Sequence, residues 1–195
     1  MGLNRDDALA LMHEYTQNEN LRRHMYAVEA AMRAYAGKFG EDEELWGVTG
    51  LLHDFDYERW PNDDRKPDDE HPSNGVKILR EGGYPQDMLA AILGHCDYTG
   101  VPRETLMAKT LFAVDELTGF LTACALVRPT GLTDLKVKSV KKKFKDSSFA
   151  RGVNREDVQA GVEQLGVEFS EHVQLVIDAM RAIQDQLGLA GGENG

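Results

Sequence analysis

Apolar residues recur at three- and four-residue steps along most of the chain, which is the spacing of a helix with one buried face. The pattern is clearest over residues 20–36, "NLRRHMYAVEAAMRAYA". It predicts an N-cap at Asn20 and an end at Gly37 or Gly40. Similar patterns predict further helices over 42–55, 85–95, 133–144, 154–165 and 169–187.

Two stretches depart from this amphipathic pattern. Residues 57–72 hold three prolines and dense charge, which predicts a loop. Pro72 is then expected in the first turn of the next helix, with His71 at its cap. Residues 101–127 have a helical pattern but are apolar on nearly every side, as is typical of a helix surrounded by others. We therefore expect 101–127 to be the central helix of the fold.

The fold class predicted from these patterns is all-α. No alternation of strand type and no internal repeat is found in the sequence. The length of 195 residues suits a single domain with one core. We expect roughly eight helices packed around the central one. Within this single domain, 1–19 is expected to form an N-terminal helix, 20–127 the main helical unit, and 128–190 a C-terminal helical extension.

Charge and cysteine content narrow the function classes. The formal net charge of −11 argues against a nucleic-acid scaffold as partner, but a local cation would still admit a small phosphorylated substrate. Two cysteines without a CxxC motif provide no disulfide framework, as is usual in a reducing compartment. The start of the chain has no long apolar run, so neither a signal peptide nor a membrane span is expected. These features favour a cytoplasmic protein, and its oligomeric state is left open.

The candidate chemistry lies in "LLHDFD" at 51–56, where a histidine and an aspartate follow an apolar segment. Burying either group without a partner would be costly. Further histidines and an aspartate occupy apolar faces or helix ends, namely His24, His71, His95 and Asp115. Taken singly, each histidine has a structural interpretation, and Asp115 could form an ion pair with Lys109 or Arg128. His13 and His172, in the terminal helices, are interpreted as structural or surface residues.

The order of these residues resembles a known family. His24, then His53 and Asp54, then Asp115 is similar to the H…HD…D pattern of the HD superfamily of metal-dependent phosphohydrolases. His71 and His95 resemble the two additional histidines of members that hold two metals. The resemblance covers roughly residues 20–127 and implies a helical HD domain with a metal site in its core.

The resemblance also implies a ligand set. One metal would be bound by His24, His53, Asp54 and Asp115, and Asp54 would bridge to a second metal held by His71 and His95. Imidazole and carboxylate ligands suit one or two divalent transition metal ions: Fe, Mn, Co, Ni or Zn. Asp54 would be the catalytic residue that orients a metal-activated water. The expected reaction is hydrolysis of a phosphoester or phosphoanhydride in a small nucleotide-like or phosphorylated metabolite.

Two other functions use a similar set of residues. Myo-inositol oxygenase and the phosphonate-cleaving HD oxygenase hold a mixed-valent diiron centre in a similar histidine-rich site. A non-catalytic HD module would use the metal or the pocket only for binding.

Candidate substrate ligands come from a basic segment and from single residues. The segment 136–151 is rich in lysine, and Lys138 and Lys141 share one side of the predicted helix. Arg128 follows the central helix, and Tyr98 follows His95. These four residues are expected to contact the substrate, although a lysine-rich helix face is also typical of a solvated surface.

Overall fold

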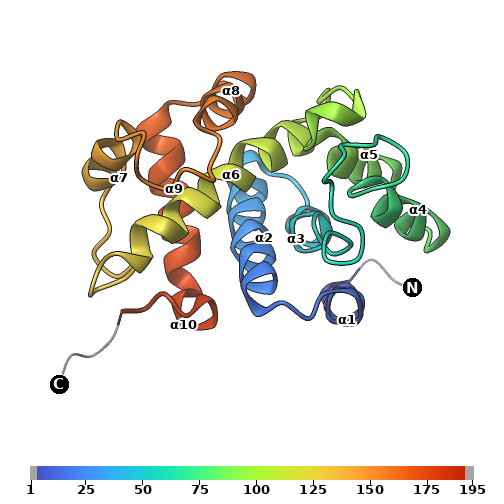
Figure 1. Ribbon diagram of the computed structural model, residues 1–195, viewed down its shortest axis with the longest axis horizontal. Coiled ribbons are helices and arrows are strands. Elements are labelled where there is room, and N and C mark those ends of the chain that lie inside the picture. The colour runs from blue at the N-terminus through green and yellow to red at the C-terminus, as the bar shows by residue number, and fades with distance from the viewer. Residues whose placement is uncertain (1–3, 192–195) are drawn as a thin grey trace.

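The computed structural model describes residues 4–191 and confirms the all-α fold (Figure 1). This range contains ten α-helices and one short 3-10 helix, rather than the roughly eight helices expected, and it contains no strand. The helices are α1 (Arg5–Tyr15), α2 (Glu19–Phe39), α3 (Glu43–Leu52), α4 (Ser73–Glu81), α5 (Gln86–Gly94), η1 (Asp97–Thr99), α6 (Leu106–Leu126), α7 (Val137–Phe144), α8 (Arg155–Leu165), α9 (Phe169–Ala182) and α10 (Gln184–Leu187).

The ends of α2 show how local chemistry sets a helix boundary. Asn18, not Asn20, is the N-cap, and its side chain accepts hydrogen bonds from the backbone N–H groups of Asn20 and Leu21. The helix runs through Gly37 and ends at Gly40, whose φ of 74° is readily adopted only by glycine. The expected N-cap was therefore wrong by two residues, and the second of the two expected stops is the one used.

Other predicted boundaries also shift. The helix expected over 42–55 ends at Leu52, so His53 and Asp54 stand at its end and in the following turn. The helix expected from residue 133 begins only at Val137, because Asp134 is held in a turn by Thr130 and Arg128. The helix expected over 169–187 is broken at Ile183, whose φ of −120° is not helical, into α9 and α10.

Helix α6 is the central element, as its apolar sequence predicted. It contacts α2, α5, α8 and α9, and its buried residues lie on several sides of the helix (Figure 1). α1 to α5 lie on one side of the molecule and α7 to α10 on the other, with α6 running between them. None of the helices in residues 4–191 has both the length and the apolar character needed to cross a membrane.

The expected boundaries inside the chain fall near helix ends. Position 127/128 follows the end of α6, and position 19/20 falls at the first residue of α2. In the segment after residue 128, α8 packs on α6, and α9 packs on both α2 and α6. The C-terminal helices therefore contact the same two helices that carry His24 and Asp115, and the division into segments stays a prediction.

Candidate metal centre

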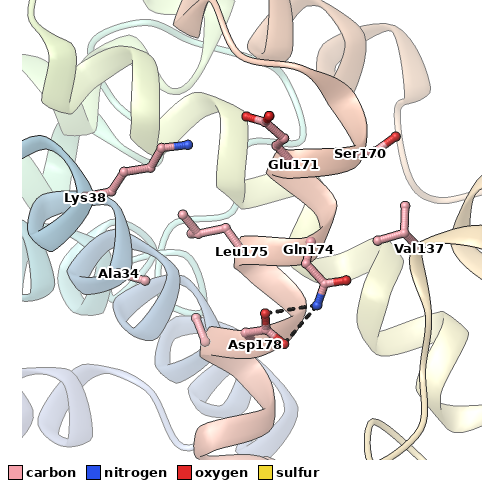
Figure 2. Close-up of a pocket in the computed structure, with 9 residues that line it drawn as sticks. Ala34, Lys38, Val137, Ser170, Glu171, Gln174, Leu175 and Asp178 are labelled. Carbon is pink, nitrogen blue, oxygen red and sulfur yellow. Dashed lines mark hydrogen bonds between the residues drawn. The ribbon is translucent and has the colours of Figure 1, made fainter.

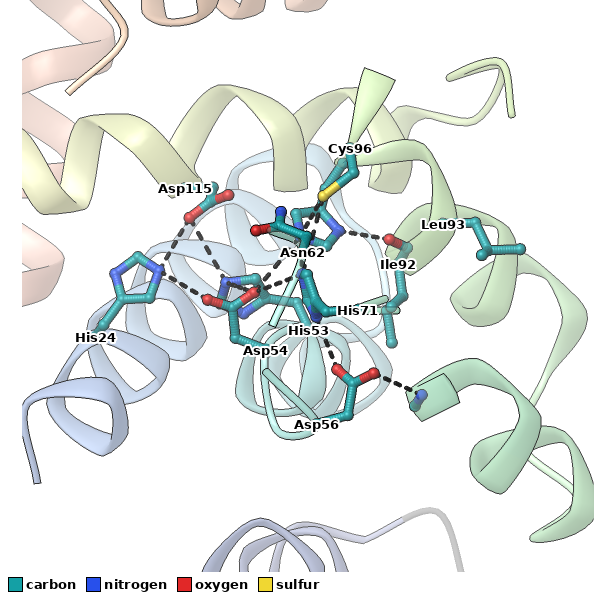
Figure 3. A network of polar contacts seen from close by, with 12 residues as sticks. His24, His53, Asp54, Asp56, Asn62, His71, Ile92, Leu93, Cys96 and Asp115 are labelled. Atoms are coloured by element: carbon teal, nitrogen blue, oxygen red, sulfur yellow. Dashed lines mark hydrogen bonds and ion pairs between the residues drawn. The ribbon is translucent and has the colours of Figure 1, made fainter. Parts of the chain in front are cut away.

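Six side chains predicted to bind metal lie together in the structure (Figure 3). They come from five separate parts of the chain. His24 is on α2, His53 and Asp54 follow α3, His71 precedes α4, His95 follows α5, and Asp115 is on α6. Helix packing thus brings together residues that are up to about ninety positions apart in the sequence.

The first group of donor atoms joins α2, α3 and α6. His24 Nε2 lies 3.0 Å from Asp115 Oδ1, and His53 Nε2 lies 3.5 Å from the same oxygen. These three residues form a cluster that could hold a metal ion. The alternative partner Arg128 instead pairs with Asp134 at 2.6 Å. Within residues 4–191, Asp115 is paired with histidines, and neither Arg128 nor Lys109 forms an ion pair with it.

Asp54 lies between this first group and the remaining histidines. Its Oδ1 is 3.2 Å from His71 Nε2 and 3.5 Å from His95 Nε2. The same oxygen is 3.4 Å from His53 Nε2, and Oδ2 is 3.7 Å from His24 Nε2. One carboxylate thus faces four imidazoles that belong to two groups, as a bridging ligand would.

Hydrogen bonds on the far sides of the imidazole rings require a proton on Nδ1 of each ring. His53 Nδ1 lies 2.7 Å from the carbonyl oxygen of Gly50, and His95 Nδ1 bonds the carbonyl of Ile92. A carbonyl oxygen only accepts, so each Nδ1 must donate a proton. In the neutral ring, Nε2 then turns a lone pair toward Asp54. Fixing the tautomer in this way prepares a histidine to ligate a metal.

Asp56 fixes the orientation and tautomer of His71 in the same way as the carbonyl groups do for His53 and His95. Its Oδ1 accepts a hydrogen bond of 2.7 Å from His71 Nδ1, and its Oδ2 accepts one of 2.6 Å from the backbone N–H of Gly75. A Cβ at Gly75 would lie 2.7 Å from the Asp56 carboxyl carbon, so glycine is needed for this approach. The only signal for Asp56 in the sequence is weak: it follows Asp54 by two positions, close enough to support the HD pair.

The cluster fits a divalent transition metal ion. His53 Nε2 is buried and has no hydrogen-bond partner in the described part of the chain. Three lone pairs on Nε2 atoms and a carboxylate oxygen repel one another unless a cation lies among them. Nitrogen and carboxylate donors suit the ions named above. The residues present therefore match the group that the resemblance implies.

The electrostatics of the cluster agree with cation binding. Burial opposes ionisation of Asp54, but His53 and His71 hold its pKa below the usual range. Burial also opposes charge on His71, yet Asp54 and Asp56 raise its pKa to about 9. The protein alone thus stabilises positive charge next to the Asp54 carboxylate, at the place where a metal ion would supply it.

The cluster is most exposed to solvent at His24 and Asp115. The side chains of His24 and Asp115 are 24% and 22% exposed, whereas those of His53 and His71 are at most 2% exposed. A cavity of about 280 Å³ opens at His24, with apolar walls that include Leu126 and Leu187. This cavity therefore adjoins the exposed edge of the cluster at His24.

Arg23 also lines this cavity and was missed by the sequence analysis. Its side chain is exposed, and within residues 4–191 no hydrogen bond or ion pair engages its guanidinium group. The only signal in the sequence was its position next to His24. Neighbouring residues on a helix face different directions, so adjacency in the sequence does not predict that Arg23 and His24 line the same cavity. They do so because α10 and the turn after it cover this part of α2.

The structure places the four expected substrate ligands in different surroundings. Tyr98 donates a hydrogen bond to the backbone carbonyl of His71 and so lies beside the cluster. Arg128 is paired with Asp134, and Lys141 Nζ lies 3.0 Å from Ser170 Oγ. Lys138 is exposed on α7, which packs against α9 and α6. The structure does not bring these last three side chains to the cluster.

A larger cavity, of about 680 Å³, lies between α2 and α9 (Figure 2). Lys38 and Glu171 project toward it, and the Gln174 amide donates hydrogen bonds to Asp178. Its lining contains no histidine or cysteine. It therefore lacks imidazole and thiolate donors and is separate from the candidate centre.

Comparison with known proteins agrees with the geometry. The family model of the HD domain matches residues 21–119, about half of the chain, and this range contains all six predicted metal ligands. No curated protein and no solved structure matched the chain. The match and the cluster together show that the chain belongs to the HD domain family, within the HD superfamily of metal-dependent phosphohydrolases.

Proposed function

We propose that this protein is a metal-dependent phosphohydrolase that cleaves a phosphoester or phosphoanhydride of a small nucleotide-like or phosphorylated metabolite. The observation that carries the proposal is the place of Asp54. It faces His24 through one carboxylate oxygen, and His53, His71 and His95 through the other. A carboxylate shared in this way suits a pair of ions acting on one phosphoryl group.

The residues of the chain have separate tasks in this reaction. Bound divalent ions would supply Lewis-acid polarisation of the phosphoryl oxygens and lower the pKa of a water molecule. Asp54 would accept a hydrogen bond from the attacking water and so orient its oxygen toward phosphorus. The new bond joins that oxygen to phosphorus while the bond from phosphorus to the leaving oxygen breaks. The water proton passes to the leaving group or to solvent.

Arg23 is proposed to hold the substrate phosphate. Its side chain lines the same cavity as His24 and has no hydrogen-bond or ion-pair partner within residues 4–191, and guanidinium groups bind phosphate oxygens through paired hydrogen bonds. Leu126, Leu187 and Leu189 supply an apolar wall for the organic part. The cavity of about 280 Å³ favours a small leaving group over a polymer.

The first experiment combines metal analysis with a substrate screen. Protein purified without added metal is examined by elemental analysis and electron paramagnetic resonance, then tested for phosphate release from a panel of phosphorylated metabolites. Metal-dependent phosphate release would support the proposal. A mixed-valent diiron signal that responds to a small alcohol or a phosphonate, without phosphate release, would favour the oxygenase. Failure to bind any metal after reconstitution would leave a non-catalytic module.

Two ligand variants test the assignment of the metals. Asp54→Ala should lose both metal loading and turnover, because both ions share this carboxylate. His71→Ala should lose mainly the second ion. Circular dichroism would establish that each variant is folded. Full activity of Asp54→Ala, or two ions still bound by His71→Ala, would contradict the assignment.

A third variant tests the substrate site. Arg23→Gln should raise KM for the phosphorylated substrate by about tenfold or more, with metal content unchanged, because it removes a charge-assisted hydrogen bond. Arg80→Gln is the matched control, since Arg80 is an exposed arginine on α4 outside this cavity. Equal KM values for the two variants would exclude Arg23 from the phosphate site.

A further inference from the structure

Cys96 lies beside the cluster but has no part in the ligand pattern described so far. It directly follows His95 after α5. Its Sγ lies 3.3 Å from His95 Nε2 and 3.8 Å from His71 Nε2, and the three donor atoms form a group that could hold a metal ion (Figure 3). The other cysteine, Cys124, is buried on α6 among core residues.

Five of the six distances among the donor atoms of His71, His95, Asp54 and Cys96 are close to those within a single coordination shell. His71 Nε2 lies 3.2 Å from His95 Nε2 and 3.2 Å from Asp54 Oδ1, and His95 Nε2 lies 3.5 Å from Asp54 Oδ1. Donors arranged tetrahedrally around one ion, with typical metal–nitrogen, metal–oxygen and metal–sulfur bonds, stand roughly 3.3–3.7 Å apart. The two distances to Cys96 Sγ belong to the same range within a few tenths of an ångström.

The surroundings of the two histidines support this arrangement. The Asp56 carboxylate accepts from His71 Nδ1 and the Ile92 carbonyl from His95 Nδ1, so both rings direct Nε2 toward the same point. Their side chains are only 2% and 4% exposed, which leaves little room for water to satisfy these nitrogens. A cation shared with the neighbouring sulfur satisfies all of them at once.

We propose that Cys96 is a fourth protein ligand of the second metal ion, together with His71, His95 and Asp54. This inference rests on the proposed function, since it concerns the same metal centre. On binding, the thiol loses its proton to solvent and a sulfur–metal bond forms, with no change in oxidation state. The second position then contains sulfur, whereas His24, His53, Asp54 and Asp115 offer the first position only nitrogen and oxygen.

This difference predicts different preferences at the two positions. A thiolate favours softer ions, so the second position should select Zn²⁺, Co²⁺ or Fe²⁺ over Mn²⁺ and Mg²⁺. The first position, with nitrogen and oxygen donors alone, should show a weaker preference of this kind. A protein supplied with both Zn²⁺ and Mn²⁺ is therefore expected to hold Zn²⁺ at the Cys96 side.

The test uses Co²⁺, because a cobalt–thiolate bond gives a charge-transfer absorption in the near ultraviolet. Full-length protein stripped of metal is titrated with Co²⁺ as wild type, Cys96→Ser and Cys124→Ala. The band should appear in wild type and in Cys124→Ala, the matched control, and should be absent from Cys96→Ser. Chelator competition should show Zn²⁺ binding weakened about tenfold or more at one position of Cys96→Ser, with little change for Mn²⁺.

The outcomes separate this inference from the proposed function. Persistence of the band in Cys96→Ser, its absence from wild type loaded with two Co²⁺ ions, or failure to bind Co²⁺ would overturn the role of Cys96. A band that depends on Cys96 in a protein that releases phosphate from no substrate would support the ligand and refute the hydrolase. Phosphate release without any such band would support the hydrolase and refute the ligand.

Discussion

At the scale of single residues, the centre depends on groups that never face the metal. Asp56 accepts one N–H from His71 and one from the Gly75 backbone, and its side chain is almost completely buried. Each carboxylate oxygen is used by one donor. An outer partner of this kind orients its ligand and commonly influences metal affinity by one to two orders of magnitude.

Replacing this carboxylate by an amide should weaken the second metal. Asn in Asp56→Asn has one acceptor oxygen in place of two, so either His71 or the Gly75 N–H loses its acceptor. We expect the affinity for the second ion to fall by about 10- to 100-fold. Asp63→Asn, at an exposed position in the loop before α4, is the control and should bind metal like wild type. Chelator competition measures both, and equal affinities would exclude this role for Asp56.

At the scale of helices, the close contact of α2 and α3 positions the first metal group. Gly50 on α3 lies against the backbone of Glu29 on α2, and a Cβ at residue 50 would stand 3.0 Å from both the Cα and the N of Glu29. Backbone atoms cannot move aside as a flexible side chain can. The contact fixes α3 at the distance that brings His53 next to His24.

A methyl group at this contact should separate the two helices. Gly50→Ala is expected to lower the free energy of unfolding by about 1–3 kcal/mol, because it overpacks a tight contact. Gly119→Ala is the control: it lies inside α6 and its nearest neighbouring atom would be 4.0 Å away. That variant should gain up to about 1 kcal/mol from helix propensity. Urea unfolding of metal-free protein measures both, and the same sign of change for both variants would contradict this account.

At the scale of the whole molecule, His172 connects three helices. Its Nε2 on α9 donates to the carbonyl of Ala113 on α6 at 2.9 Å, and its Nδ1 accepts from the hydroxyl of Tyr35 on α2 at 2.5 Å. The side chain is buried, which confirms the structural interpretation of this histidine. Burial lowers the pKa of His172 to about 4.

This depressed pKa predicts acid sensitivity. Between its ordinary pKa of 6.5 and about 4, His172 takes up a proton more readily in the unfolded chain than in the folded one. The stability contributed by the neutral ring is therefore complete above pH 6.5 and is lost as the pH falls toward 4, by about 3 kcal/mol. His172→Gln should be less stable at pH 7 but should lose less stability over this window. Urea unfolding of metal-free protein at several pH values tests this, and an unchanged slope would refute it.

Metal removal should also affect the whole molecule, since the donors come from five parts of the chain and meet only when it is folded. Ligands that bind only the folded state raise its stability by mass action, by about 2.7 kcal/mol at a concentration 100 times Kd. We expect chelator to lower the Tm of wild type and to leave the Tm of Asp54→Ala unchanged. Thermal unfolding with and without chelator measures this, and an equal response of both proteins would argue against a shared site.

Local sequence patterns were enough to predict the fold class, the central helix and the candidate histidines and aspartates, and the resemblance to the HD superfamily implied that six of them form one ligand set. Helical periodicity, and polar residues that interrupt an apolar helix face, are recognised from neighbours within a few positions of the sequence. Helix ends were predicted less well. The N-cap of α2 is Asn18 and not Asn20, and α7 begins after the turn that holds Asp134. Both boundaries depend on side-chain hydrogen bonds, which the pattern of apolar residues does not contain.

The sequence by itself therefore determined an all-α protein of the HD family with a histidine- and aspartate-rich centre. Only the tertiary structure decided which donors meet. It placed Asp54 between two groups, brought Cys96 to the second and Arg23 to the open side, and left Lys138, Lys141 and Arg128 away from the cluster. The physical reason is that these distances are set by helix packing between segments far apart in the chain, to which no local pattern is sensitive.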